Sequence, residues 1–168
     1  FRHKTFRRAN GKTRVLRIWD QTLTPASLEA SPEAITDPAI ASTPTPLGYG
    51  VDYTQQHIDD TLAEQDPVVR VRHVDRNGHG SHVAGISAGD GSQNGHCHGA
   101  FRYIGVAPEA DIMMVRLWGL TKGDTNRPPT PNSLLVDAVR YLMDQARKAS
   151  KPLVINMSLG KFGELMDG

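Results

Sequence analysis

The sequence has 168 residues, of which 38% are hydrophobic and 22% are charged. This length and composition describe one globular domain with a hydrophobic core and argue against a disordered chain. Nineteen Lys and Arg residues against 18 Asp and Glu give a net charge of +1 at pH 7, so no overall field predicts a nucleic-acid or anionic membrane partner. Basic residues crowd the first 17 positions without an aromatic stacking platform, and we expect a solvated surface there rather than a nucleic-acid site.

The single cysteine, Cys97, cannot form a disulfide within the chain, and the sequence therefore leaves the cellular compartment open. No run approaches the roughly 18 continuous apolar residues of a membrane span. The opening residues are basic and polar, unlike the apolar core of a signal peptide. We expect a soluble segment with no membrane span and no signal peptide.

Three segments fill the first half of the chain. A β-rich run at 13–19 predicts a strand, and the Pro, Ser, Thr, Ala and Gly composition of 21–50 predicts a long surface excursion. Apolar residues spaced four apart predict a short amphipathic helix over 52–65, with Tyr53 or Thr54 as its N-cap.

The second half predicts strands and helices in alternation. Small and apolar residues followed by Gly89 predict a helix at about 79–88. Apolar runs predict strands at 111–117 and 153–157. Between these strands, 132–149 has helical periodicity behind a candidate cap at Asn132. Strand, helix and strand in this order predict a right-handed parallel crossover, and hence an α/β fold with a parallel sheet.

The densest chemical signal is the run DRNGHGSHVAGISAG at 75–89. Here Gly78 and Gly80 flank His79 at the expected helix start. A general base needs an imidazole held in an exposed position, where a nucleophile can approach within hydrogen-bond reach. His79 fits that role.

The sequence resembles the subtilisin-like serine peptidases (peptidase family S8) in three blocks, which follow the family's order and approximate spacing. The blocks are HGSHVAG at 79–85, GVAPE at 105–109 and NMSLG at 156–160. The resemblance implies a subtilisin-like three-layer α/β fold with a mostly parallel sheet, which we expect to be truncated at both ends. It also implies a serine endopeptidase that hydrolyses peptide bonds with an Asp-His-Ser triad, acting on peptide or protein substrates.

By the resemblance, His79 is the catalytic base of the triad. The residues that it implies to be structural around the base are Asn77, Gly78, Gly80 and His82. The residues that it implies to form one wall of the substrate cleft, pairing with an extended peptide, are Ser158, Leu159 and Gly160.

The other two triad members are not found in this sequence. The family order is Asp, His, Ser, yet no GTSMA-like serine segment follows His79, and Ser158 belongs to the cleft wall. We therefore expect this chain alone to be inactive.

Two alignments of the acid are available. The run GYGVDY at 48–53 puts Gly48 where the catalytic aspartate belongs. The opening run with Phe1, His3 and Phe6 instead resembles the segment directly after the aspartate in a subgroup with a long insertion. We prefer the second alignment, which makes 1–168 a partial peptidase domain with 21–74 as an insertion and leaves Asp20 as a strand-ending residue.

Two alternatives to the peptidase remain. One is a non-catalytic subtilisin-like domain that binds peptide. The other is a metal-binding protein, although no HExxH or CxxC pattern is present. Its candidate ligands are His73, His79, His82, His96, Cys97 and His98. No cofactor is identified, and calcium enters only by family resemblance, without a ligand cluster to hold it.

Overall fold

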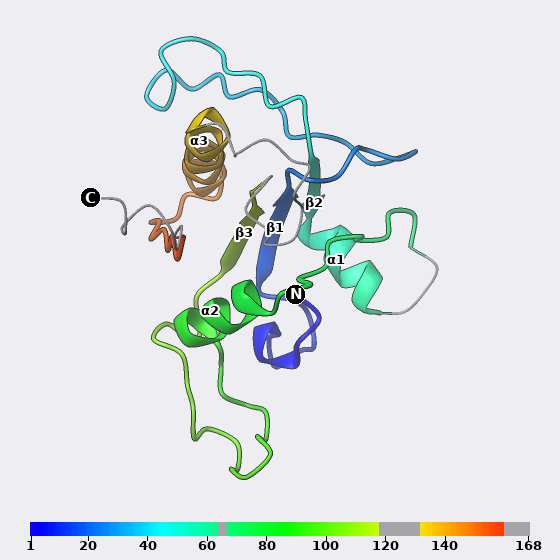
Figure 1. Ribbon diagram of the computed structural model, residues 1–168, viewed down its shortest axis with the longest axis vertical. Coiled ribbons are helices and arrows are strands. Elements are labelled where there is room, and N and C mark those ends of the chain that lie inside the picture. The colour runs from blue at the N-terminus through cyan, green and yellow to red at the C-terminus, as the bar shows by residue number, and fades with distance from the viewer. Residues whose placement is uncertain (64–66, 118–131, 160–168) are drawn as a thin grey trace, which may run out of the picture.

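The computed structural model describes residues 1–63, 67–117 and 132–159 (Figure 1). Three strands form one sheet in the order β2-β1-β3: β1 is Val15–Asp20, β2 is Val51–Thr54 and β3 is Ile112–Arg116. β1 runs antiparallel to β2 and parallel to β3. The centre of the sheet is therefore the strand that ends at Asp20.

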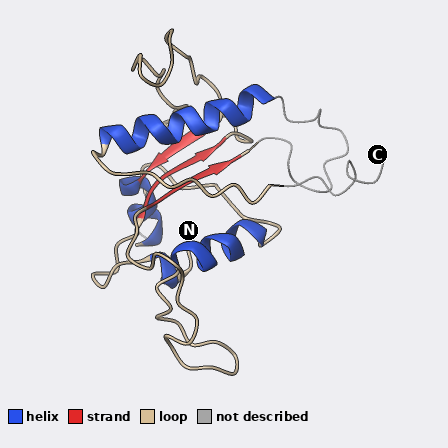
Figure 2. Cartoon of the chain, turned by 90° about the vertical axis from the view of Figure 1, so that its left-hand side faces the viewer, coloured by secondary structure: helices blue, strands red, loops and turns tan. Residues whose placement is uncertain are grey.

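Helices cover both faces of this sheet. α1 is Gln55–Leu62, α2 is His79–Ala88 and α3 is Asn132–Lys148, and a short 3-10 turn occupies Lys4–Phe6. Figure 2 shows the long helix α3 along one face, with α2 beyond the other face. The described chain is therefore a mixed α/β structure in three layers.

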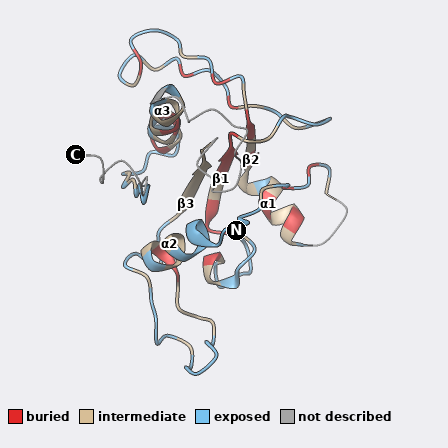
Figure 3. Cartoon of the chain, in the orientation of Figure 1, coloured by how far each residue is buried: buried red, intermediate tan, exposed pale blue. Residues whose placement is uncertain are grey.

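Alternation along the strands divides the core into two clusters, one on each face. Figure 3 shows buried residues along β1 and β2 and on the neighbouring helices. Ile18 and Tyr53 pack towards α1, and Ala84 of α2 joins the same cluster. Trp19 points the other way and packs with Tyr141 of α3, their ring centroids 5.0 Å apart. This period-two burial is what a sheet covered on both sides requires.

Most predicted elements are confirmed, with shifted ends. α2 has the predicted bounds, while β1 and β3 differ from the predictions by one or two residues. α1 is shorter than predicted, because residues 51–54 form β2, a strand that the sequence did not predict. Thr54 caps α1 reciprocally with His57: each backbone N–H donates to the other's side chain at 3.3 Å.

The prediction that 21–50 is a surface excursion is only partly right. The segment contains no helix or strand, yet Ile35, Ala41 and Leu47 are buried and pack in the cluster of Trp19. A single ladder bridge joins Ile35 to Thr45. These widely spaced apolar residues follow no helical or strand period, and composition alone therefore concealed their burial.

The predicted strand at 153–157 is wrong. This segment has no strand pairing, and Val154 is 95% exposed. A strand needs a ladder partner, and in the described ranges β3 pairs only with β1. The predicted parallel crossover from β3 through α3 is therefore not completed. α3 itself begins at Asn132, the residue predicted to cap it.

No helix within the described ranges is long and apolar enough to cross a bilayer.

Candidate active site

His79 is the first residue of α2, and its side chain is exposed to solvent. Gly78, the residue before it, has φ +81°, a left-handed conformation that glycine adopts without strain. The role of Gly78 in shaping the turn that presents His79 stays a prediction. His82 lies one turn further along α2 and is also exposed, and its structural role stays a prediction.

Asp75 caps this helix in place of Gly78, which has no side chain to do so. Asp75 Oδ1 accepts from the backbone N–H of Gly78 at 2.9 Å, and Oδ2 accepts from the N–H and hydroxyl of Ser81, both at 2.8 Å. The backbone N–H of Asn77 also donates to Oδ1, at 3.2 Å. One carboxylate thus fixes the backbone on both sides of His79.

Burial raises the pKa of Asp75, but the hydrogen bonds from Ser81, Gly78 and Asn77 outweigh it and hold that pKa below its ordinary value. An ionised carboxylate at a helix N-terminus also interacts favourably with the helix dipole. Asp75 was not singled out from the sequence, although an acidic residue shortly before a helix start is a recognisable capping signal.

The C-terminal end of α2 is held by Arg14, which is 3% exposed. Its guanidinium donates to the carbonyl oxygen of Ala88, and to those of Thr5 and Ala110 at 2.8 Å each. A cation at a helix C-terminus is favoured by the dipole. Arg14 therefore does not belong to the solvated basic surface predicted for the first segment; it directly precedes β1 and turns inwards.

Gly105 of the GVAPE block packs against the same end of α2. A Cβ atom at Gly105 would lie 2.5 Å from the backbone N of Gly89, closer than any side chain tolerates. The two glycines are also joined by a backbone hydrogen bond of 2.8 Å. This contact gives a physical reason for the glycine that begins the GVAPE block.

Asp52 is the one carboxylate within the GYGVDY run that the first alignment used, and its side chain is engaged elsewhere. Asp52 accepts from the Tyr141 hydroxyl at 2.7 Å and pairs with Arg17 at 3.0 Å. Burial raises the pKa of Asp52, although the Tyr141 hydrogen bond and the Arg17 charge act in the opposite direction. In the described part of the chain, no hydrogen bond or ion pair engages the His79 imidazole, and Gly48 offers no acid.

Asp20 is more than the strand-ending residue that the sequence suggested. Its side chain is fully buried and contacts His73 and Arg116. The contact with His73 Nδ1 measures 2.8 Å. Asp20 thus connects the sheet to the segment that leads into His79.

Of the predicted cleft residues, Ser158 and Leu159 are described and belong to no helix or strand. Ser158 and Leu159 are exposed, and Asn156 contacts the Ser158 hydroxyl at 3.3 Å. Gly160 lies outside the described residues. The cleft assignment of these three residues stays a prediction.

The model of the Subtilase family matches residues 34–167 of this sequence, which is most of the chain. The chain belongs to the subtilase family. Among its relatives, a subtilisin of Bacillus sp. (strain TA39) is 30% identical, in a match covering 83% of this chain and 38% of that subtilisin. The major intracellular serine protease of Bacillus subtilis (strain 168) is 34% identical over 61% of this chain and 25% of its own length.

A solved structure of a subtilase relative has the same fold. The CspB protease of Clostridium perfringens superposes with a TM-score of 0.64 and 30% identity, covering 95% of this chain and 26% of that protease. The predicted fold class is therefore confirmed as a subtilisin-like α/β fold. The expectation of a mostly parallel sheet is not met in the described residues, because β1 pairs with β2 antiparallel and with β3 parallel. This subtilase chain spans less than two-fifths of the subtilisin it matches.

The histidines and the cysteine proposed as metal ligands do not gather in the described part of this subtilase chain. No group of three or more His, Cys, Asp or Glu side chains there is arranged to hold a metal ion. His73 instead contacts Asp20, and His98 packs edge-on against Tyr103 with ring centroids 5.3 Å apart. Cys97 is exposed.

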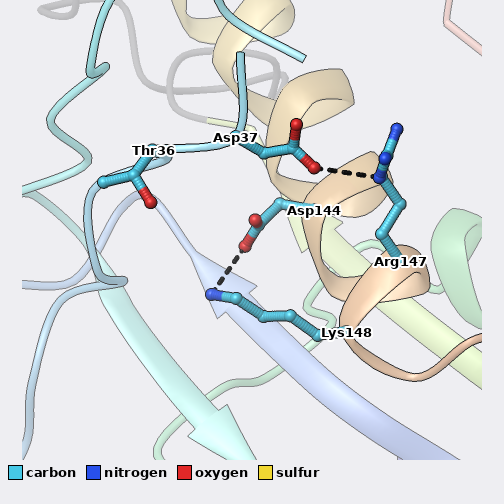
Figure 4. A pocket seen from close by; sticks show the side chains of 5 residues that line it. All are labelled: Thr36, Asp37, Asp144, Arg147 and Lys148. Carbon is cyan, nitrogen blue, oxygen red and sulfur yellow. Dashed lines mark ion pairs between the residues drawn. The ribbon is translucent and has the colours of Figure 1, made fainter. Parts of the chain in front are cut away.

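A pocket on the opposite face of the subtilase sheet lies between α3 and the 21–50 segment (Figure 4). Its charged lining residues pair with each other. Arg147 contacts Asp37 at 2.9 Å, and Lys148 contacts Asp144 at 2.8 Å. The Arg147–Asp37 pair connects the segment to α3, whereas the Lys148–Asp144 pair lies within α3. Both pairs lie beyond the sheet from α2 and are therefore separate from His79.

Proposed function

We propose that this chain supplies the general base, His79, of a subtilisin-like serine endopeptidase. The observation that carries the proposal is the position of His79 in the HGSHVAG motif of a subtilase. There it stands exposed at the first residue of α2, on a turn held by Asp75. An exposed imidazole on a rigid turn is what general-base catalysis requires.

In the proposed reaction, His79 removes the proton of a serine hydroxyl as that oxygen attacks the peptide carbonyl. The protonated imidazole then donates the proton to the leaving amine. An aspartate orients the ring and stabilises the imidazolium without becoming protonated itself.

The serine and the aspartate are proposed to lie on chain segments outside these 168 residues, so that 1–168 is part of a peptidase domain. Residues 21–74 are proposed to be an insertion between the acid and the base. The absence of helix and strand from 21–50 supports this reading. Because triad members act as a unit, we expect no measurable peptide hydrolysis from the chain alone.

Substrates are proposed to be extended peptides or proteins. Ser158, Leu159 and Gly160 would form one wall of their cleft by backbone pairing. The exposure of Ser158 and Leu159 supports this assignment, because a partner strand can reach exposed residues.

The complete coding sequence around this segment tests the proposal. A D-x-G-x-D pattern before Phe1 and a GTSMA-like segment after Gly168 would support an active peptidase with His79 as its base. Other residues at both positions would overturn it and leave a subtilase domain that binds peptide without cleaving it.

A further inference from the structure

Asp20 forms a buried junction at the carboxyl end of the central strand. Oδ1 accepts from the backbone N–H and the hydroxyl of Thr22, at 3.0 and 2.6 Å. Oδ2 lies 2.8 Å from His73 Nδ1 and 3.5 Å from an Arg116 nitrogen. Since an ionised carboxylate only accepts, the Nδ1 atom of His73 must carry the proton of this hydrogen bond.

The ionised state of Asp20 is well supported by these contacts. Burial raises the pKa of Asp20, but hydrogen bonds from His73 and Thr22 outweigh it and hold the pKa below its ordinary value. A buried charge that loses one partner is strongly destabilised. The junction therefore resists separation of His73 from the sheet.

The partners of Asp20 connect three distant parts of the chain. His73 lies 53 residues beyond Asp20, and Arg116 lies 96 residues beyond it. Arg116 at the end of β3 also donates to the backbone carbonyl of Val74 at 3.3 Å. Residues 73 and 74 are thus held against the ends of both parallel strands.

The held segment runs directly into the turn that presents the base. Asp75 follows Val74 and binds the backbone N–H groups of Gly78 and Ser81 on either side of His79. A continuous series of contacts therefore runs from the sheet, through residues 73–75, to the first turn of α2. Each contact in it is made by a charged or ionisable side chain.

We propose that Asp20 is a positioning residue for His79: through His73 and Arg116 it fixes where residues 73–75 leave the sheet, and hence where α2 begins. Asp20 does not touch the reacting atoms. The proposed effect of Asp20 on the rate of catalysis rests on the proposed peptidase function. Its effect on the position of residues 75–82 does not.

Hydrogen–deuterium exchange of the full chain tests the positional effect. The amides to follow are those of Gly78, Ser81 and His82, which donate to Asp75 or to the Gly78 carbonyl. In Asp20→Asn these amides should exchange about ten-fold faster than in the wild type, while those of α3 stay unchanged. The matched control is Asp52→Asn, because Asp52 is a partly buried carboxylate paired in β2.

Substitutions of His73 keep the test decisive if Asp20→Asn unfolds. His73→Ala removes the donor to Asp20 and should speed the same amides. His73→Asn should restore wild-type exchange, because its amide nitrogen occupies nearly the position of Nδ1. Unchanged exchange in His73→Ala, or acceleration of these amides by Asp52→Asn to the same extent, would overturn the proposal.

Kinetics of the complete peptidase separate positioning from mere stability. His73→Ala should lower kcat by ten-fold or more with KM within two-fold, since misplacement of a catalytic group by about 1 Å can cost 10²-fold. His73→Asn should recover most of kcat. A rise in KM with kcat unchanged would contradict the proposal. A wild-type protein without activity would refute the peptidase function and leave the exchange result to decide the role of Asp20.

Discussion

Replacing Asp75 by alanine removes the cap of the helix that begins with His79. The four donors that Asp75 satisfies are three backbone N–H groups and the Ser81 hydroxyl. Loss of an N-cap costs about 1 kcal/mol, and loss of a negative charge at a helix N-terminus adds roughly 0.5 kcal/mol. We therefore expect Asp75→Ala to lower the free energy of unfolding by about 1.5 kcal/mol and Tm by roughly 3–6 °C.

Urea denaturation followed by tryptophan fluorescence measures this loss, because Trp19 is fully buried in the folded chain. Ser81→Ala should cost less, about 0.5–1 kcal/mol, since it removes one neutral donor among four. Glu33→Ala is the control, because the Glu33 side chain is 90% exposed, and it should change stability by less than about 0.5 kcal/mol.

The effect of Asp75→Ala also has a defined pH dependence. Because the folded-state pKa of Asp75 is lowered, its stabilisation is fully present above the unfolded-state pKa, about 4 for Asp, and is lost as pH falls through the lowered value. The difference between wild type and variant should therefore shrink in acid. Equal stabilities at pH 7, or a difference that persists unchanged at pH 2, would refute the capping role.

Three further predictions concern the stability of the fold. Leu47→Ala should lower stability by about 2–5 kcal/mol in the same denaturation assay, because Leu47 is 1% exposed, whereas Leu28→Ala, at a position 71% exposed, should have little effect. Tyr141→Phe should cost about 1–3 kcal/mol, since it removes the hydroxyl that donates to Asp52, and an unchanged urea midpoint would contradict this. The hydrogen bond from Arg72 is the main cause that lowers the pKa of Glu29 to about 2. The stabilisation of the fold by ionised Glu29 is therefore present above about pH 4.5 and lost as pH falls towards 2. Thermal melts should show Glu29→Gln losing less stability than wild type over that interval.

Local patterns in the sequence were enough to predict the elements that carry the candidate base. The small residues of α2 and the glycine that follows it marked both ends of that helix, and His79 therefore lies where the motif predicted. β1 and β3 could be predicted for a similar reason, since short β-rich or apolar runs indicate strands in a sheet covered on both faces.

Features that depend on distant partners could not be read from the sequence. Asp20 resembles any strand-ending residue until His73 and Arg116 are brought beside it. Leu47 stands in a Pro- and Thr-rich run, and only its packing near Trp19 reveals its burial. The run at 153–157 has a strand-like composition, yet no neighbouring strand in the described ranges pairs with it.

The central claim, that His79 is the base of a serine peptidase, is tested most directly by kcat for peptide hydrolysis in the complete protein. His79→Ala is compared there with His82→Ala, a change at the exposed histidine one turn further along the same helix. The account predicts that His79→Ala loses roughly 10⁶-fold in kcat, a magnitude already known for a subtilisin, while His82→Ala retains at least a tenth of the activity. Activity of His79→Ala within ten-fold of the wild type would contradict the account.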